Sequence, residues 1–309
     1  MPEYLAYYLQ QNDVREFLAQ NVSGVGGSLM RVKPSILSQL LLRLPPLPEQ
    51  RRIVAKIETL TRCLDHAVSS LRAAQGKLAA AARSIVQGAC SHPHPQSRNV
   101  RIGNVADCLD SRRIPVNRHE REKRGGSIPY FGANGQVGWI DKPLFDEPLI
   151  LVVEDETFVG RTKPFAYRIE GPSWVNNHAH ILRPRVGTSL RYLRYALMYY
   201  PFTPLTTGST GRRKLTQEAL MTAPILLPDP DEQHRRAESL DRWFSIADQL
   251  GKAIENAILR AAHLRQAILK KAFDGKLVSQ DPNDEPASVL LERIRAARAH
   301  SARGTRALR

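Results

Sequence analysis

Apolar residues recur every three or four positions along two long stretches of the chain. In the first, the intervals alternate between four and three residues from Ile53 to Ile85, and in the second they do so from Leu240 to Ile268. Such a spacing places one apolar stripe along a helix and is typical of coiled coils. We therefore expect long helices over residues 48–92 and 231–275, packed against each other as an antiparallel coiled coil.

The two helical stretches belong to an internal repeat. The segment Pro48–Arg52 recurs as Asp231–Arg235, and the correspondence runs on at an offset of 183 positions to the ends of both helices. Upstream, a Tyr-Leu pair at Tyr4 recurs at Tyr192, at an offset of 188. A repeat of this length indicates two copies of one structural unit within the chain.

The rest of the chain differs from the helices. Short apolar runs such as Leu149–Val153 alternate with Gly/Pro turns through residues 98–230, which predicts a mixed domain of helices and strands. Residues 1–47 read as the tail of a first, incomplete copy of that domain. Residues 281–309 read as a loop, a short helix and a basic tail. The expected fold class is therefore α+β, with one complete mixed domain and two long helices.

The amino-acid composition indicates which classes of partner the protein binds. Lys and Arg total 45 against 30 Asp and Glu, a net charge of +15 that favours nucleic acid as the partner. The longest apolar run has five residues, far below the roughly 20 needed to span a membrane. The three cysteines (Cys63, Cys90 and Cys108) lack metal-site spacing and are too few for a disulfide scaffold. We expect reduced thiols, a cytoplasmic location and no membrane partner.

Motifs for catalysis are absent from the sequence. There is no phosphate-binding loop for a nucleotide and no Gly-rich loop after a strand that would hold S-adenosylmethionine. We therefore expect no catalytic residue and no cofactor in this chain. Two alternatives stay open: a metal-dependent nuclease that uses Glu154, Asp155 and His178, and a coiled-coil interaction protein that binds DNA without sequence preference.

Two histidines offer a weak metal hypothesis. If Trp174–Leu182 forms a single strand, His178 and His180 point to one face. The same face would carry Trp174 and Leu182, which favours buried, hydrogen-bonded imidazoles over metal ligands, so we expect no metal. Nearby, Asn134-Gly135 predicts a tight hairpin turn.

Basic clusters are the strongest candidates for contacts with DNA. One lies in a region bounded by Pro and Gly that we expect to be a loop, and another follows a Thr/Ser-rich turn. The candidate DNA-binding residues are Arg112, Arg113, Arg118, Arg121, Lys123, Arg124, Asn134, Thr207, Ser209, Arg212, Arg213 and Lys214.

Four segments together resemble a known family, the specificity (S) subunits of type I restriction–modification systems. Leu44–Val54 opens the first long helix and Leu264–Val278 closes the second. Ile128–Gly135 and Trp174–His180 are similar to motifs of the target-recognition domains of these subunits. The segments occur in the family's order and are distributed over nearly the whole chain.

The resemblance implies an adaptor that performs no chemistry. Such subunits read double-stranded DNA through two target-recognition domains held apart by conserved helices. They recruit methyltransferase (M) subunits, which use S-adenosylmethionine to methylate adenine, and restriction (R) subunits, which need ATP and Mg²⁺. Here residues 98–230 match a complete recognition domain, and residues 1–47 match only the end of another. The chain is then either truncated or a half-type subunit that pairs with a second S-type chain.

Overall fold

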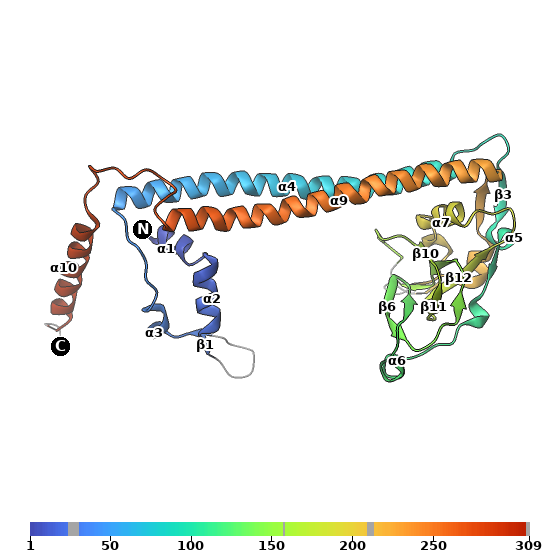
Figure 1. Ribbon diagram of the computed structural model, residues 1–309, viewed down its shortest axis with the longest axis horizontal. Helices are drawn as coiled ribbons and strands as arrows, with labels where there is room; N and C mark the ends of the chain where they lie inside the picture. Colours follow the sequence, from blue (N-terminus) through green and yellow to red (C-terminus); the bar gives the residue numbers. More distant parts are fainter. Residues whose placement is uncertain (24–30, 157, 209–212, 307–309) are drawn as a thin grey trace. The chain divides into compact units, whose positions relative to one another are not determined.

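The computed structural model describes residues 1–23, 31–156, 158–208 and 213–306 (Figure 1). It divides into two compact units: unit 1 comprises residues 1–75 and 251–309, and unit 2 comprises residues 76–250. Helix α4 (Leu47–Ser91) begins in unit 1 and ends in unit 2, whereas α9 (Pro230–Phe273) runs from unit 2 to unit 1. The α+β fold class with two long helices is confirmed.

Unit 1 is mainly helical. Besides its parts of α4 and α9, it contains α1 (Pro2–Tyr8), α2 (Asn12–Gln20), the paired strands β1 (Val22–Ser23) and β2 (Arg31–Val32), α3 (Pro34–Leu37) and α10 (Ala287–Arg306). Its core joins Tyr4 and Tyr8 of α1, Ile53 and Ile57 of α4, and Phe273 of α9. The small helices at the chain's start are thus held by the long helix pair.

Unit 2 contains two four-stranded sheets. The antiparallel sheet has the order β10 (Ala166–Ile169), β8 (Leu149–Val153), β12 (Ala179–Pro184), β4 (Ala106–Cys108). The mixed sheet has the order β6 (Gly135–Ile140), β5 (Ile128–Gly132), β11 (Pro172–Val175), β7 (Phe145–Asp146), with β5 and β11 parallel. Two further pairs are β3 (Arg98–Arg101) with β14 (Pro224–Leu227) and β9 (Asp155–Glu156) with β13 (Arg213–Lys214).

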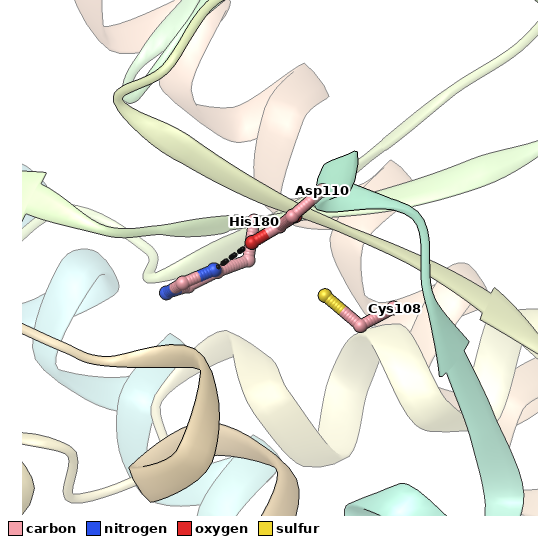
Figure 2. A group of neighbouring side chains, drawn as sticks. All are labelled: Cys108, Asp110 and His180. Atoms are coloured by element: carbon pink, nitrogen blue, oxygen red, sulfur yellow. Dashed lines mark hydrogen bonds and ion pairs between the residues drawn. The ribbon is translucent and has the colours of Figure 1, made fainter. Parts of the chain in front are cut away.

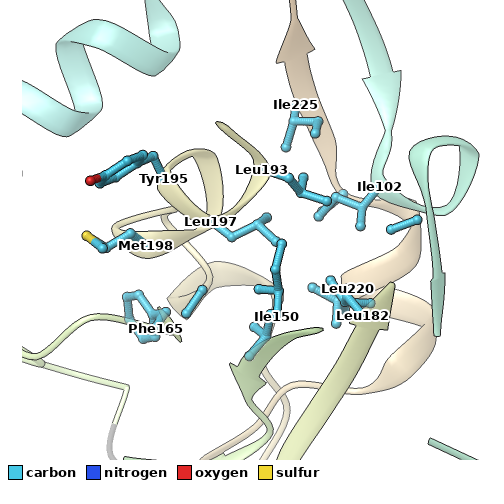
Figure 3. Packing of buried hydrophobic residues seen from close by; sticks show 14 of the residues in the cluster. Ile102, Ile150, Phe165, Leu182, Leu193, Tyr195, Leu197, Met198, Leu220 and Ile225 are labelled. Carbon is cyan, nitrogen blue, oxygen red and sulfur yellow. The ribbon is translucent and has the colours of Figure 1, made fainter. Parts of the chain in front are cut away.

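Helices of unit 2 complete this domain. They are α5 (Ile102–Val105), α6 (Arg118–Arg124), α7 (Leu190–Met198) and α8 (Gln217–Thr222), with 3₁₀ turns η1 (Asp110–Arg112) and η2 (Thr203–Leu205). Helix α7 begins at the N-cap Ser189, whose side chain accepts a hydrogen bond from the Tyr192 amide. Its apolar side faces the antiparallel sheet (Figure 3).

Strand β8 has an unbroken run of apolar residues because both of its faces are buried. Ile150 and Val152 join the cluster that contains α7, whereas Leu149 and Leu151 join a second cluster with residues of the mixed sheet. All five residues of the strand are fully buried. A strand covered on both faces needs no polar alternation, so this sequence pattern is the expected one.

The expected single strand over Trp174–Leu182 is wrong. β11 ends at Val175, β12 begins at Ala179, and the two strands belong to different sheets. Between them, Asn176 turns the chain by accepting a hydrogen bond at its side-chain oxygen from the His178 amide, at 2.9 Å. Asn readily stabilises such a local turn, and here it outweighs the strand-like composition.

The antiparallel arrangement of α4 and α9 is confirmed at both ends. In unit 1, Ile53 near the start of α4 packs in one cluster with Leu269 near the end of α9. In unit 2, Arg236 near the start of α9 donates to the carbonyl oxygens of Ala89 and His92 at the end of α4, at 2.7 and 2.9 Å.

Only part of the expected apolar seam is buried. Along α9, Ile254 and Ala261 are at most 9% exposed, whereas Leu250 and Leu264 on the same stripe are about half exposed, at 49% and 54%. Two helices alone cover a narrow strip of each other, so seam positions at its margin keep contact with water.

The internal repeat extends to buried hydrogen bonds. Gln233 accepts a bond from the backbone amide of Ser189 at the start of α7 and donates to the Pro228 carbonyl, at 2.8 Å in each case. In the first copy, Gln50 accepts from the amino group of Met1 at 3.0 Å and donates to the Pro45 carbonyl at 2.9 Å. Met1 and Ser189 are therefore equivalent positions.

A tyrosine makes the second repeated contact. Tyr192 donates its hydroxyl proton to the carbonyl oxygen of Leu226, and Tyr4 donates to that of Arg43, at 2.8 and 3.0 Å. Each pair of equivalents keeps the offset seen in the sequence, 188 for the tyrosines and 183 for the acceptors. The repeat is thus one of structure as well as of sequence.

Candidate nucleic-acid interface

A largely buried network of charged groups lies where strand β8 of the antiparallel sheet ends and strand β12 begins. Glu154, which follows β8, accepts from Arg113 at 2.5 Å and pairs with the Lys214 ammonium at 3.1 Å. Arg113 also lies 3.2 Å from a carboxylate oxygen of Asp110 and donates to the Ala179 carbonyl at 2.9 Å. The network joins segments far apart in the sequence and fixes their relative positions.

His180 belongs to the same network. Its Nδ1 lies 2.5 Å from Asp110 Oδ2, and its Nε2 lies 2.8 Å from the carbonyl oxygen of Leu215 (Figure 2). Burial by itself would raise the pKa of the Asp110 carboxyl, but the bond to His180 and the charge of Arg113 hold that pKa below its usual value. The imidazole of His180 is therefore a buried, hydrogen-bonded group.

Cys108, Asp110 and His180 lie close enough together to suggest a metal site, but their chemistry does not fit one. Both ring nitrogens of His180 already lie within hydrogen-bond distance of an oxygen atom, so neither points toward a vacant coordination position. In the metal-free protein, burial raises the pKa of the Cys108 thiol to about 12. The cluster fits a structural role.

The lowered pKa of Asp110 predicts a measurable dependence on pH. Because ionised Asp110 stabilises the folded state, its contribution is present above the ordinary carboxyl pKa and is lost as the pH falls through the folded value. At pH 7, Asp110→Asn should therefore lower the free energy of unfolding by roughly 1–3 kcal/mol. The difference in the free energy of unfolding between Asp110→Asn and the unsubstituted protein should shrink as the pH falls below about 4. Urea unfolding followed at several pH values measures it, and a constant difference would contradict the assignment.

The three groups of the nuclease alternative do not form an open metal site. Glu154 is buried and already paired with two cations, Arg113 and Lys214. His178 Nδ1 lies 3.6 Å from a carboxylate oxygen of Asp155. A catalytic metal needs carboxylate oxygens that are free to coordinate it. Glu154 instead neutralises the largely buried Arg113 and pairs with the exposed Lys214.

Helix α6 carries four of the predicted DNA-binding residues, in a segment that we expected to be a loop. Asn117 caps this helix by accepting a hydrogen bond from the Glu120 amide at 2.8 Å, which explains why a helix forms there. Arg124 anchors it, since its guanidinium donates to Asp141 at 2.6 Å and lies 4.6 Å from the ring centre of Trp174.

The other basic residues of α6 face more open surroundings. Arg118 is 84% exposed at its side chain and pairs with Glu122, one turn along the helix. Lys123 is exposed as well. Arg121 lies over the ring of Tyr130, with 4.7 Å from its guanidinium carbon to the ring centre. Cation–ring stacking of this kind fixes the direction in which an arginine presents its donors.

Arg118 and Arg121 border two adjoining hollows, which we call the α6 groove. One, of about 530 Å³, is also lined by Gly126, Gly138 and Trp139. The other, of about 450 Å³, is also lined by Asn117, Tyr130, Asn176, Asn177 and His178. The groove thus combines basic, amide and aromatic groups, the residue types that contact nucleic acids, with the carboxylates of Glu120 and Glu122.

Two residues of this surface were not among the predicted binding residues. Trp139 and Val137 on β6 are 54% and 50% exposed, although they are large and apolar. Their alternation with the buried Ile140 was available as a signal, because successive side chains of a strand point to opposite faces. An exposed Trp beside two arginines is a further reason to regard the α6 groove as a binding surface.

Arg112 and Arg113 turn out to have different roles. Arg112 is half exposed, lies 3.4 Å from Glu147 and stacks at 4.9 Å on the Phe145 ring. Arg113 is only 14% exposed at its side chain and is held by Asp110 and Glu154. We therefore no longer expect Arg113 to contact DNA, because its donors are engaged inside the protein.

Several polar groups in the segment around Thr207 are engaged in hydrogen bonds and ion pairs within the protein. Thr207 and Lys214 exchange backbone hydrogen bonds at 2.9 and 2.8 Å. Arg213 donates to the hydroxyl and the carbonyl of Thr206 at 2.7 and 2.8 Å, so its donors are used within the chain. Lys214 pairs with Glu154 but remains 59% exposed. Ser209 and Arg212, two further predicted residues, lie outside the described residues.

Asn134 lies in the turn between β5 and β6, so a hairpin forms where it was predicted, but its turn is shifted by one position from the expected Asn134-Gly135. The register pairs Gly132 with Gly135, which leaves Ala133 and Asn134 as the turn residues. Gly135 has a φ of 114°, a conformation that favours glycine. The Asn134 side-chain oxygen accepts a hydrogen bond from Arg161 at 2.6 Å, so this turn is tied to the segment before β10.

Comparison with known proteins gives a consistent picture. The family model described as the type I restriction modification DNA specificity domain matches residues 96–260, more than half of the chain. The StySPI specificity subunit of Salmonella potsdam, a type I restriction enzyme subunit, is 25% identical over 345 aligned residues, which cover 97% of this chain and 72% of that one. The EcoEI specificity subunit of Escherichia coli is 71% identical over 131 aligned residues, but these cover only 29% of this chain and 22% of that one.

Comparison with solved structures gives the same result as the sequence comparisons. A chain from a study of complex assembly and conformational transition of the type I R-M system superposes with a TM-score of 0.71 at 26% identity, over 89% of this chain and 72% of that one. The HsdS subunit from Thermoanaerobacter tengcongensis gives 0.54 at 25% identity, over 89% and 70%. Among the described residues, every helix is too short or too polar to cross a membrane.

Proposed function

Because the chain belongs to the family of type I restriction–modification DNA specificity domains, we propose that unit 2 binds double-stranded DNA in a sequence-specific way and performs no chemistry itself. The observation that carries this proposal is the α6 groove, where exposed basic residues, amides and an exposed Trp border one surface. The net charge of +15 supports a polyanionic ligand.

Different residues of the groove suit different contacts. Arg118 and Lys123 are exposed, and the surface pair between Arg118 and Glu122 is easily exchanged for a phosphate. Arg121 is oriented by Tyr130 and borders the same hollow as Asn176 and Asn177. Arginine and asparagine are the side chains that bind guanine and adenine edges through two hydrogen bonds. We assign contacts with DNA phosphates to Arg118 and Lys123, and contacts with base edges to Arg121. Arg112, Arg124, Asn134, Thr207 and Lys214 remain proposed contacts.

The rest of the assembly follows from the same proposal. The equivalent starts of α4 and α9, marked by the buried Gln50 and Gln233, would present two similar docking surfaces for methyltransferase (M) subunits. Restriction (R) subunits would join that core in the cytoplasm. S-adenosylmethionine, ATP and Mg²⁺ would be bound by these partners, and this chain would hold none of them.

Salt dependence of DNA binding tests the phosphate contacts. Replacing Arg118 and Lys123 together with Ala should weaken binding to every duplex alike. The slope of log affinity against log salt concentration should shrink by about 1.8, because each phosphate contact contributes about 0.9. Fluorescence anisotropy on labelled duplexes between 50 and 200 mM salt, roughly the range in which such contacts are lost, measures the slope.

Exposed cations elsewhere in unit 2 provide the control. Arg242, 68% exposed on α9, pairs with Glu238 at 3.3 Å and lies outside the groove, so Arg242→Ala should leave the slope unchanged. An unchanged slope in the Arg118/Lys123 variant would show that α6 does not face the DNA backbone.

A further inference from the structure

Two equivalent glutamates near the starts of the long helices have different surroundings. Glu232 on α9 is 6% exposed, and the guanidinium groups of Arg235 and Arg236 both bond to its carboxylate. Its counterpart at the offset of 183 is Glu49 on α4, which is only 4% exposed. Among the described residues, no hydrogen bond or ion pair involves the carboxylate of Glu49. The two copies of the repeat therefore treat the same buried carboxylate differently.

The residues that would supply these guanidinium groups in unit 1 are either apolar or engaged elsewhere. Ile53, which is 1% exposed, stands at the position of Arg236. Arg52, the counterpart of the second arginine, donates to both carboxylate oxygens of Asp284, at 2.7 and 3.3 Å. The hydrogen bond to Asp284 raises the pKa of Arg52, whereas the charge of Glu49 makes a smaller contribution in that direction. Arg52 therefore neutralises Asp284 rather than Glu49.

Glu49 lines a cavity of about 260 Å³ beside the start of α4. Tyr4 and Phe273 are among the lining residues, and their ring centroids lie 4.9 Å apart. Burial raises the pKa of the Tyr4 hydroxyl to about 12, and the negative charge of Glu49 adds to that increase. Asp274, just past the end of α9, supplies a second carboxylate among the lining residues. The cavity therefore combines negative charge with aromatic surface, an environment that favours a planar cation.

The guanidinium of Arg236 occupies the equivalent position in unit 2. Besides its bond to the glutamate, it donates to the carbonyl oxygens of Ala89 and His92 at the end of α4, at 2.7 and 2.9 Å. The counterparts of these two acceptor residues at the offset of 183 are Ala272 and Gly275, and both line the cavity in unit 1. Carbonyl groups at the end of a helix lack intrahelical donors and carry partial negative charge, so they attract cations. The cavity thus keeps the counterparts of the residues that hold a guanidinium group in unit 2.

We propose that this cavity, defined by Glu49, Ala272 and Gly275, binds a guanidinium group presented by a small molecule or by an arginine of a partner polypeptide. Glu49 would accept two parallel hydrogen bonds, as carboxylates commonly do from guanidinium groups, and the two carbonyl oxygens would accept from the remaining donors. Arg43, the basic residue among the lining residues, is exposed and forms no ion pair with Glu49. The proposal concerns unit 1 and does not depend on which residues of unit 2 contact DNA.

Titration of the full chain with ethylguanidinium tests the proposal. The δ1 methyl NMR signal of Ile53 reports on binding, because Ile53 lines the cavity, and Ile53→Val identifies the signal. Ethylammonium is the comparison compound, since it has the same charge but lacks the planar set of donors. At constant ionic strength, ethylguanidinium should shift the signal saturably, with a dissociation constant about tenfold or more below that of ethylammonium.

Glu49→Gln is the decisive variant. It keeps the shape of the side chain and removes its charge, so the affinity for ethylguanidinium should fall about tenfold or more. Because this substitution breaks no ion pair between described residues, the urea midpoint of the chain should stay nearly unchanged. Glu232→Gln is the matched control: it weakens internal ion pairs and should lower the urea midpoint of unit 2, but the titration followed at Ile53 should remain as in the unsubstituted chain.

Assembly with methyltransferase subunits distinguishes the two sources of the guanidinium group. An arginine supplied by these subunits would occupy the cavity, so ethylguanidinium would no longer shift the Ile53 signal in the complex. A shift that persists in the complex would identify a small guanidinium compound as the ligand.

Three kinds of result would overturn the proposal. The absence of a saturable shift would show that no guanidinium group binds in the cavity. Equal affinity in Glu49→Gln, or equal affinity for ethylammonium, would show that the carboxylate does not select a guanidinium group. A shift that appears only in Arg43→Ala would show that the side chain of Arg43 itself occupies the cavity.

Discussion

Ile57→Asp should unfold unit 1 at a denaturant concentration at which unit 2 is still folded. Ile57 is 0% exposed and packs in the cluster that contains Tyr4 and Phe273. A carboxylate there would be buried without a partner, so we expect the free energy of unfolding to fall by about 4 kcal/mol or more. Leu264→Asp is the matched control: this residue lies on the same apolar seam but is 54% exposed, and its cost should be below about 1 kcal/mol.

The chain offers a simple way to follow the two units separately. Its three tryptophans, Trp139, Trp174 and Trp243, all lie in unit 2, so their fluorescence reports on that unit. Circular dichroism reports on helices of both units. In Ile57→Asp, part of the helical signal should be lost at a lower urea concentration while the tryptophan transition stays in place. Equal costs for Ile57→Asp and Leu264→Asp would contradict the packing described for α4 and α9.

Glu154→Ala should have the second large effect, this time on unit 2. Removing the carboxylate leaves Arg113 buried beside Asp110 with one partner fewer, and it releases Lys214. Breaking a buried ion pair on one side typically costs about 3–5 kcal/mol, so the tryptophan transition should move to much lower urea. Glu154→Gln keeps the shape of the side chain and should cost less, because the amide oxygen can still accept from Arg113.

Glu147→Ala is the comparison for this prediction, since Glu147 pairs with Arg112 at 3.4 Å on the surface. A surface pair of this kind contributes at most about 1 kcal/mol. If Glu154→Ala proved as mild as Glu147→Ala, Glu154 would not be the neutralising group of a buried network. A DNA-cleaving activity with Mg²⁺ that disappears in Glu154→Gln would instead support the nuclease alternative.

The long helices were predictable because their signal is local and repeated. A 3.5-residue apolar period over several turns specifies a helix and its packing face, and the 183-residue offset added an independent copy. The antiparallel orientation followed from the domain between the helices. The exposure of Leu250 and Leu264 did not follow, because the width of the covered strip depends on what packs on the pair.

The strands and the binding surface were harder to predict, because they depend on individual side-chain contacts in the folded protein. The break after Val175 depends on one side-chain hydrogen bond of Asn176, which composition does not reveal. Arg113 reads as a solvated charge in the sequence, yet Glu154, 41 positions away, holds it inside the protein. Trp139 is not among the predicted DNA-binding residues, yet the fold leaves it at the surface beside the arginines of α6. For Arg113 the deciding partner is remote in sequence, whereas the break after Val175 depends on a local contact between Asn176 and His178.

Selection of duplexes from a randomised pool tests the central claim, sequence-specific recognition by unit 2, most directly. The chain, assembled with its methyltransferase subunits, is incubated with duplexes that contain a randomised stretch, and the retained molecules are sequenced. The account predicts one enriched motif, and it predicts that Arg121→Ala relaxes the preference at one base pair by about 1–3 kcal/mol while the rest of the motif persists. Retention of DNA without any enriched motif would contradict it.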